Sequence, residues 1–278
     1  MFSKKLKIKK IEILGLLSRT LPRRLVGRLL LARANFTKAS IEGLEFSVAS
    51  NKKDLEAAYH LLYNCYQKQG YMKENDAHLR VTSFHALPTT STLIAKLDGE
   101  VVATVSIVRA GVFGVPLESS LSIDEIKNDP RKIISEISSL GIHEQLRGKL
   151  SEILIPMYKF LYLYGRNYLH TDYFLIGVHP KSFIFYKFLF GFKELSKGVE
   201  RSYRAVNDAP MVAGFLELST LQEYLHKTYS NVNKTRDLHY YFFETEDLHF
   251  KYPFREFHSS FDCCLLYTSD AADDSLRV

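Results

Sequence analysis

Apolar side chains recur along this chain with two different spacings, and each spacing predicts a kind of element. Between residues 54 and 69 they fall three or four positions apart, which predicts an amphipathic helix that ends at Gly70. Two apolar, β-branched runs follow at 91–96 and 100–108, and the pair Asp98-Gly99 between them is typical of a hairpin turn. This half of the chain therefore predicts a helix followed by two antiparallel strands.

The second half of the chain alternates short apolar runs with longer helical patterns. Strands are expected at 133–142, 173–178, 203–204 and 211–218, and helices at 149–166, 180–191 and 221–228. Pro156 should kink or restart the first of these helices, because proline lacks a backbone N–H. Strands mixed with helices after an antiparallel hairpin indicate an α+β, or mixed α/β, fold around a central sheet.

Positive charge is concentrated at the start of the chain. Residues 1–44 hold eleven Lys and Arg against two Glu, a net charge of +9. Because the whole chain has a net charge of +6, the remaining residues sum to −3. Helical spacing continues through 3–34 and is broken at Pro22. Two interpretations stay open: an amphipathic arm that binds an anionic membrane or a partner, or a packed helix pair with a solvated charged side.

The last residues show no helical or strand periodicity, unlike the rest of the chain. Residues 264–278 resemble a translated sequencing adapter, so we exclude 263–278 from the fold and expect the native chain to continue beyond residue 262. Elsewhere the sequence lacks phosphate-binding glycine loops, HExxH, GxSxG and CxxC motifs. These absences disfavour nucleotide-driven, zinc-dependent and α/β-hydrolase chemistry, and we expect no metal.

Several segments, in this order, resemble the N-acyl amino acid synthase family, a long-chain branch of the GNAT acyltransferases. They are AYHLLYNCYQKQGYM (58–72), HALPTTSTLIAKLDGEVVATVSIV (85–108), GVPLE (114–118), SEISSLGI (135–142), VHPKSFIFYKFLFGF (178–192) and VNDAPMVAGFLEL (206–218). The resemblance implies a GNAT-like domain over 45–220, with a mostly antiparallel twisted sheet flanked by helices. Residues 1–44 would then form an N-terminal arm and 221–262 a C-terminal extension.

The resemblance also implies the substrates. The family transfers a long acyl chain from acyl carrier protein to the α-amine of an amino acid. The usual acetyltransferase phosphate loop is only vestigial at 145–149, which fits a carrier-protein phosphopantetheine better than coenzyme A, although acyl-CoA stays open as donor. The chain departs from the family pattern at four positions, which are His60, Leu62, Ser139 and His179.

Glu136 is the first candidate for the general base. It lies in an apolar strand, where alternation puts Glu136, Ser138 and Leu140 on one face. A carboxylate there is costly unless it faces a cleft or a partner, and desolvation would raise its pKa toward useful basicity. The alternative is a structural pairing, for example with Arg109. Ser138 could hold the amine, a water or the carbonyl.

Other candidates concern the thioester. Tyr186 matches the tyrosine that protonates the thiolate in many GNAT enzymes, although four neighbouring phenylalanines equally fit a core residue. By the same resemblance, the backbone of Leu140, Gly141 and Ile142 would contact the pantetheine. The run Arg147, Gly148 and Lys149 precedes a helix and predicts a phosphate site, with an ordinary charged loop as the alternative.

Candidates for the acceptor lie on the hairpin. Arg109 ends its second strand and could bind an amino acid carboxylate. Thr89 and Thr90 could line the acyl or amino acid pocket, or simply cap a turn.

The leading hypothesis is therefore a bacterial, cytoplasmic N-acyltransferase, peripheral on the inner membrane through residues 1–44. It would use acyl carrier protein as partner, with no nucleic acid and no tightly bound cofactor. The alternatives are an acyl-homoserine-lactone synthase, another GNAT acyltransferase, and a non-catalytic GNAT-like module that binds membranes or partners.

Overall fold

A computed structural model describes residues 21–32, 34, 36, 41–195, 201–246 and 249–252. The adapter-like segment and most of the basic arm lie outside these residues, so the hypotheses about them stay predictions. Within the described part of the chain, no helix is long and apolar enough to cross a membrane.

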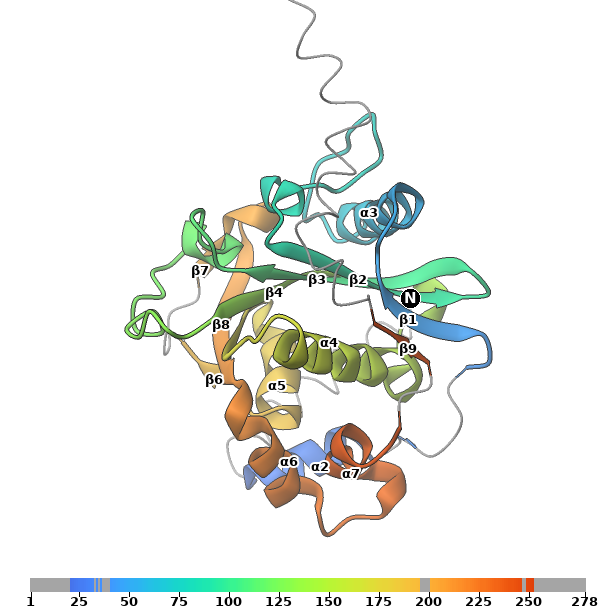
Figure 1. The fold of residues 1–278 in the computed structure, drawn as a ribbon, viewed down its shortest axis with the longest axis vertical. Coiled ribbons are helices and arrows are strands. Elements are labelled where there is room, and N and C mark those ends of the chain that lie inside the picture. The colour runs from blue at the N-terminus through green and yellow to red at the C-terminus, as the bar shows by residue number, and fades with distance from the viewer. Residues whose placement is uncertain are drawn as a thin grey trace, which may run out of the picture.

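The centre of the molecule is a nine-stranded mixed sheet (Figure 1). Its strands are β1 (Leu44–Val48), β2 (Thr90–Leu97), β3 (Glu100–Arg109), β4 (Ile134–Ile142), β5 (Tyr173–Val178), β6 (Lys193–Glu194), β7 (Arg201–Tyr203), β8 (Ala209–Glu217) and β9 (Phe250–Lys251). The order is β6-β8-β5-β4-β3-β2-β1-β9, and β7 pairs with β8. Among the described strands only β4–β5 and β1–β9 are parallel, so the expected mostly antiparallel sheet is confirmed.

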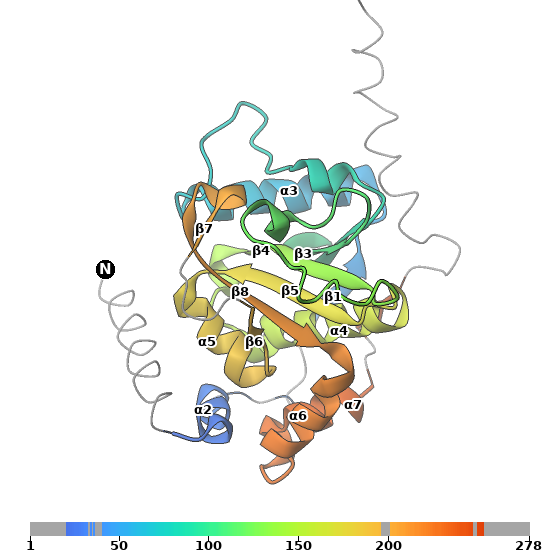
Figure 2. The ribbon, with the colours of Figure 1, turned by 90° about the vertical axis from the view of Figure 1, so that its left-hand side faces the viewer.

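Helices cover both faces of this sheet. The longer ones are α2 (Arg23–Leu30), α3 (Lys52–Gln67), α4 (Ile155–Asn167), α5 (Pro180–Leu189), α6 (Leu221–Tyr229) and α7 (Leu238–Phe243). Figures 1 and 2 show α3 on one face, α4 and α5 on the other, and α2, α6 and α7 beyond them. Short helical turns are η1 (Ser83–Ala86), η2 (Pro116–Ser119), η3 (Glu144–Leu146), η4 (Leu150–Leu154), η5 (Arg204–Val206), η6 (Leu218–Thr220) and η7 (Lys234–Arg236).

The local predictions hold where turn chemistry specifies them. Asp98 and Gly99 connect β2 to β3 with φ values of +52° and +86°, as a tight hairpin with right-handed strand twist requires. Pro156 lies in the first turn of α4, and the preceding turn η4 is π-helical. The helix therefore restarts at the proline, one of the two expected outcomes.

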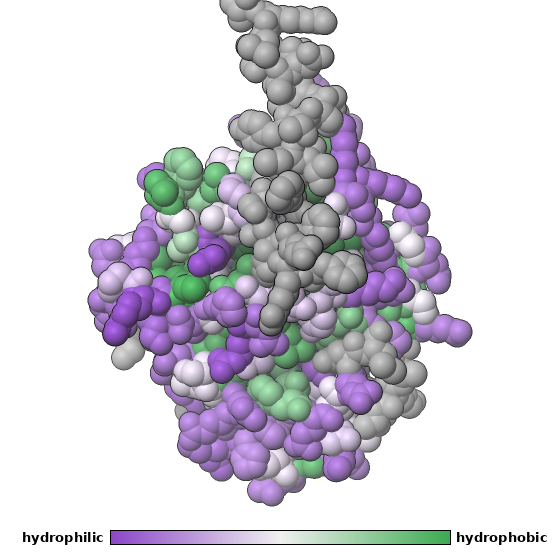
Figure 3. Space-filling model, in the orientation of Figure 1, coloured by the Kyte–Doolittle hydropathy of each residue, from purple (hydrophilic) through white to green (hydrophobic). Residues whose placement is uncertain are grey.

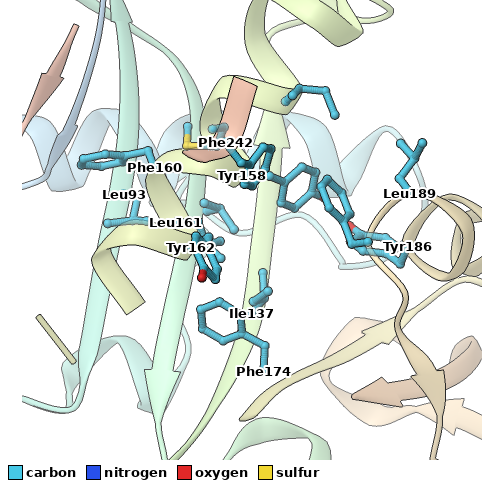
Figure 4. Close-up of a cluster of buried hydrophobic side chains, with 14 of the residues drawn as sticks. Leu93, Ile137, Tyr158, Phe160, Leu161, Tyr162, Phe174, Tyr186, Leu189 and Phe242 are labelled. Atoms are coloured by element: carbon cyan, nitrogen blue, oxygen red, sulfur yellow. The ribbon is translucent and has the colours of Figure 1, made fainter. Parts of the chain in front are cut away.

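The largest core lies beneath the α4 and α5 face of the sheet. Figure 4 shows its aromatic side chains converging from α4, α5, α7 and the strands. Lys159 of α4 is fully buried there, and its ammonium donates to the carbonyl oxygens of Tyr241 (2.6 Å) and Thr245 (3.0 Å). These bonds attach α7 and the turn that follows it to the core.

The part of α2 that the structure describes packs against the body. Val26 and Gly27 are buried, and the Arg28 Nε donates to the carbonyl oxygen of Thr228 (2.9 Å). Leu25 and Leu29 are 44% and 50% exposed on its other side. Figure 3 shows a mostly hydrophilic face with small hydrophobic patches.

Candidate active site

Strand β4 changes course halfway along its length. It pairs with β5 as far as Ile137 opposite Ile176, and this pairing then ends. On its other side, the register with β3 shifts so that Ser139 and Leu140 together oppose Val105. Ser139 has a φ of +54°. A bulge of this kind bends a strand, and here the ends of β4 and β5 separate beyond it.

A cavity of about 480 Å³ opens where the two strands separate. Its wall includes Ser138, Ser139 and Leu140 of β4, Gly177 and Val178 of β5, and the tyrosines Tyr66, Tyr186 and Tyr203. Its volume lies within the roughly 300–1,000 Å³ typical of sites for small molecules. The cavity therefore has room for a substrate at the one parallel junction between central strands.

A second cavity of about 290 Å³ adjoins the first. Leu140, Ser182 and Tyr186 line both cavities. The second cavity is otherwise mostly apolar, and Leu30 of α2, Leu154 and Tyr158 contribute to its wall. A substrate with an extended arm can therefore pass between the separated strands and contact both cavities.

Glu136 lies directly behind the wall of the larger cavity. It is 1% exposed, and its Oε1 accepts from the Tyr203 hydroxyl while its Oε2 accepts from the Leu117 N–H, both at 2.6 Å. Burial raises the pKa of Glu136 to about 7, although both hydrogen bonds oppose this rise. The structural pairing with Arg109 is wrong, since the carboxylate bonds to Tyr203 and Leu117 instead.

Gly177 allows these two partners to close over Glu136. A Cβ at this position would lie 3.0 Å from Leu117 Cδ1, 3.2 Å from Tyr203 Cε1 and 2.8 Å from Met211 Sδ. A larger residue would therefore crowd the Tyr203 ring, whose hydroxyl donates to the carboxylate. The Tyr203 hydroxyl also forms a hydrogen bond with the side chain of Ser138. Glu136 and Ser138 therefore lie on the same face of β4, as expected.

Tyr186 comes from α5 to the junction of the two cavities. It is buried, and its hydroxyl is 2.5 Å from that of Tyr158 (Figure 4). Burial raises the pKa of Tyr186, and the hydrogen bond with Tyr158 opposes the rise. Tyr186 therefore stays protonated at neutral pH, as a proton donor must.

The other predicted thioester contacts are dispersed. The missing Cβ of Gly141 faces α3, 3.1 Å from Leu62 Cδ2, and Ile142 is back in register opposite Ala103. Arg147, Gly148 and Lys149 are exposed in the turn before η4, and the Arg147 Nε donates to the carbonyl oxygen of Ile142 (3.3 Å). Of this set, only Leu140 lines the cavities.

The predicted acceptor residues lie away from both cavities. Arg109 borders a separate depression with Lys127, Asp129 and Lys132. The Thr90 hydroxyl donates to the carbonyl oxygen of Phe84 (2.5 Å), and the Thr89 carbonyl accepts from the Arg109 N–H (2.9 Å). The structure therefore gives both threonines local backbone roles.

Several residues of the larger cavity have no clear signal in the sequence, and three of them, Tyr66, Tyr203 and Arg80, matter most for the chemistry. Tyr66 belonged to a regular apolar helix face, Tyr203 to a short strand, and Arg80 to no motif. Burial raises the pKa of Tyr66 to about 12 while the nearby Arg80 opposes this rise. Among the described residues, no cluster of three His, Cys, Asp or Glu side chains could hold a metal ion.

Comparison with known proteins matches this chain to one family. The family model of the N-acyl amino acid synthase FeeM matches residues 57–217, which is more than half of the chain. Among curated proteins no sequence matches significantly.

Solved structures share the fold. FeeM, an N-acyl amino acid synthase from uncultured soil microbes, is 21% identical with a TM-score of 0.54 over 65% of this chain and 94% of its own. The CoA-dependent acyl-homoserine lactone synthase BjaI, determined with SAM and isopentyl-CoA, is 12% identical with a TM-score of 0.52 over 80% and 100%. The acyl-homoserine lactone synthase LasI is 15% identical with a TM-score of 0.50 over 68% and 96%.

Proposed function

This chain belongs to the N-acyl amino acid synthase family and is an N-acyltransferase of GNAT fold, and we propose that it joins a long acyl chain to the α-amine of an amino acid. The donor in this proposal is the thioester of an acyl carrier protein. The observation that carries the proposal is the pair of adjoining cavities where β4 and β5 separate, with Glu136 behind one wall and Tyr186 at their junction.

The geometry supports separate roles for the residues around the cavities. The amine nitrogen attacks the thioester carbonyl carbon, the C–S bond breaks, and an amide and a thiol result. Glu136 receives the amine proton through the Tyr203 hydroxyl, which bonds to Oε1 and lines the cavity. Tyr186 donates a proton to the departing sulfur. In this proposal the backbone N–H groups of Ser139 and Leu140, two residues that line the cavity, face the carbonyl oxygen.

The second cavity supports a donor with a long arm. Its mostly apolar wall suits the pantetheine or acyl chain, and the exposed cations of α2, Arg23 and Arg24, lie on the helix that contributes Leu30 to it. Carrier proteins are acidic in general, so this charge favours their approach. Lys149 and Arg147, exposed before α4, remain our candidates for the single phosphate of the arm.

An acyl-homoserine-lactone synthase is the rival assignment, because BjaI was determined with SAM. SAM carries a positive sulfonium group. The described lining of the larger cavity holds Arg80, Arg204 and His179 but no Asp or Glu. SAM shares its α-carboxylate and α-amine with other amino acids, so the sulfonium is the distinguishing group, and a lining with two arginines and no carboxylate disfavours it.

Purified protein tests the proposal with four donor and acceptor pairs. Palmitoyl-acyl carrier protein and palmitoyl-CoA are each offered with a mixture of the twenty amino acids or with SAM, and products are identified by mass spectrometry. We expect an N-palmitoyl amino acid, formed faster from the carrier protein. Acyl-homoserine lactone as the main product would contradict the proposed amino acid acceptor. Equal or faster reaction with palmitoyl-CoA would contradict the proposed carrier-protein donor.

A further inference from the structure

Arg80 places a fixed positive charge on the wall of the larger cavity. The residue is only 8% exposed, and its guanidinium carbon lies 4.2 Å from the centre of the Tyr66 ring. Its backbone N–H donates to the carbonyl oxygen of Tyr59 in α3 (3.1 Å). Just before it, Asn75 and Leu79 exchange two hydrogen bonds of 2.9 and 3.3 Å that fix the loop. Arg80 is therefore held in position by α3 and its own loop.

The charge of Arg80 is felt by the neighbouring groups. Burial, and to a smaller extent the positive charge of Arg80, lower the pKa of His85 to about 4. A neutral His85, bonded through Nδ1 to the Thr82 N–H (3.0 Å), adds no second charge. Arg204 is exposed at the rim, which leaves Arg80 as the buried cation among the described lining residues.

Arg80 also lies next to the groups that we propose for catalysis. Tyr66, on which the guanidinium stacks, interacts electrostatically with both Tyr186 and Tyr203. A ligand held by Arg80 is therefore beside the proposed acid and the hydroxyl that connects to Glu136. In an α-amino acid the carboxylate and the amine are attached to the same carbon, so fixing one orients the other.

We propose that Arg80 binds the α-carboxylate of the acceptor and so restricts the enzyme to amines that carry an adjacent anion. A guanidinium binds a carboxylate through two parallel hydrogen bonds. This inference rests on the proposed function and names the chemical group by which that site selects its acceptor. It replaces Arg109, which the structure places at a separate depression.

Steady-state kinetics with two matched acceptors test the inference. One is the amino acid that the wild-type enzyme uses best, and the other is its primary amide, which keeps the amine and side chain but lacks the anion. We expect wild type to prefer the acid. Arg80→Met should raise KM for the acid by about ten- to a hundredfold, as expected for the loss of a charged hydrogen-bonded contact, and change KM for the amide by less than about threefold.

Two control variants separate binding from folding. Arg80→Lys keeps the charge but not the paired geometry, so its KM for the acid should lie between those of wild type and Arg80→Met. Arg236→Met removes an exposed arginine on η7 and should change neither KM. Thermal unfolding of each variant is measured on the same preparations, and Arg80→Lys carries the test if Arg80→Met does not fold.

The outcomes that overturn the inference are distinct from those that overturn the proposed function. Equal losses with acid and amide in the Arg80 variants would make Arg80 a purely structural residue. An acid-specific loss in Arg109→Met, absent from Arg80→Met, would assign the carboxylate to Arg109. Wild type that acylates the amide as well as the acid would also remove the inference. Wild type that acylates no amino acid would instead remove the proposed function.

Discussion

Replacing Glu136 by Gln tests whether this buried carboxylate acts as the base. The amide keeps the size of the side chain and both contacts, because its oxygen can accept from the Leu117 N–H while its nitrogen donates to the Tyr203 oxygen. Only basicity is lost. General-base catalysis is typically worth about 10²–10⁴-fold, or roughly 3–5 kcal/mol of barrier. We expect the rate at neutral pH to fall by that factor.

The pH dependence of the rate gives a second readout. With the pKa of Glu136 at about 7, the wild-type rate should rise as this carboxyl ionises near pH 7. The Gln variant should lose that rise. Its deficit should shrink at high pH, where the free amine needs no base.

Stability gives a third readout, and its sign follows from the same carboxyl. The pKa of Glu136 rises from 4.5 in the unfolded chain to about 7 in the folded protein, so the folded state holds the proton more tightly. The stability that the protonated group contributes is fully present below pH 4.5 and is lost as the pH rises through about 7. At about 1.4 kcal/mol per pH unit, the loss is about 3 kcal/mol.

Urea unfolding of wild type and Glu136→Gln at pH 4.5, 6 and 8 measures this loss. Other carboxyl groups titrate in both proteins, so their contributions cancel in the difference. The variant should gain about 3 kcal/mol relative to wild type between the lowest and the highest pH. A stability difference that stays constant with pH, together with a nearly fully active variant, would rule out Glu136 as the base.

Three further predictions concern other parts of the chain. Tyr186→Phe should lower kcat by about 10²-fold, the low end for a general acid, with binding of the acyl donor unchanged in a direct titration. Weaker donor binding at unchanged kcat would make Tyr186 a packing residue. Residues 1–44 should increase sedimentation of the protein with anionic vesicles, because each cation close to such a surface contributes up to ~1 kcal/mol. Equal binding to neutral vesicles, or equal binding by a protein that begins at residue 45, would contradict this. Removing 264–278 should leave the melting temperature and the activity unchanged, and a loss of several degrees would show that this segment packs on the body.

The sequence predicts the elements whose signals are local. The hairpin at Asp98-Gly99, strand 173–178 and the helix opened by Pro180 all appear where turn chemistry or hydrophobic runs place them. Strands β1, β6 and β9 and helix α7 were missed. β9 is two residues long, and it exists only because Phe46 and Phe250 meet in the parallel register of β1, which no local pattern encodes.

The site was predictable only in part, for a related reason. Glu136 stands out in sequence because a carboxylate in an apolar strand needs an explanation, and Tyr186 stands out by resemblance. Ser139 gives no sign of its positive φ, since serine is not a residue that favours it. Arg80 is isolated in the sequence, and its meaning depends on α3 and η1 folding back around one cavity. Arg109 has the clearer sequence signal, at the end of a predicted strand, but the structure places it at a separate depression.

Whether this chain makes N-acyl amino acids can be measured directly in the lipids of cells that express it. Extracts of cells producing wild type, Glu136→Gln or no protein are compared by mass spectrometry, which identifies the acyl chain and the amino acid together. We expect long-chain N-acyl amino acids in the wild-type extract, strongly reduced amounts with Glu136→Gln and none without the protein. Wild-type cells that contain folded protein but show no new N-acyl amino acid, or that accumulate acyl-homoserine lactones instead, would contradict this expectation.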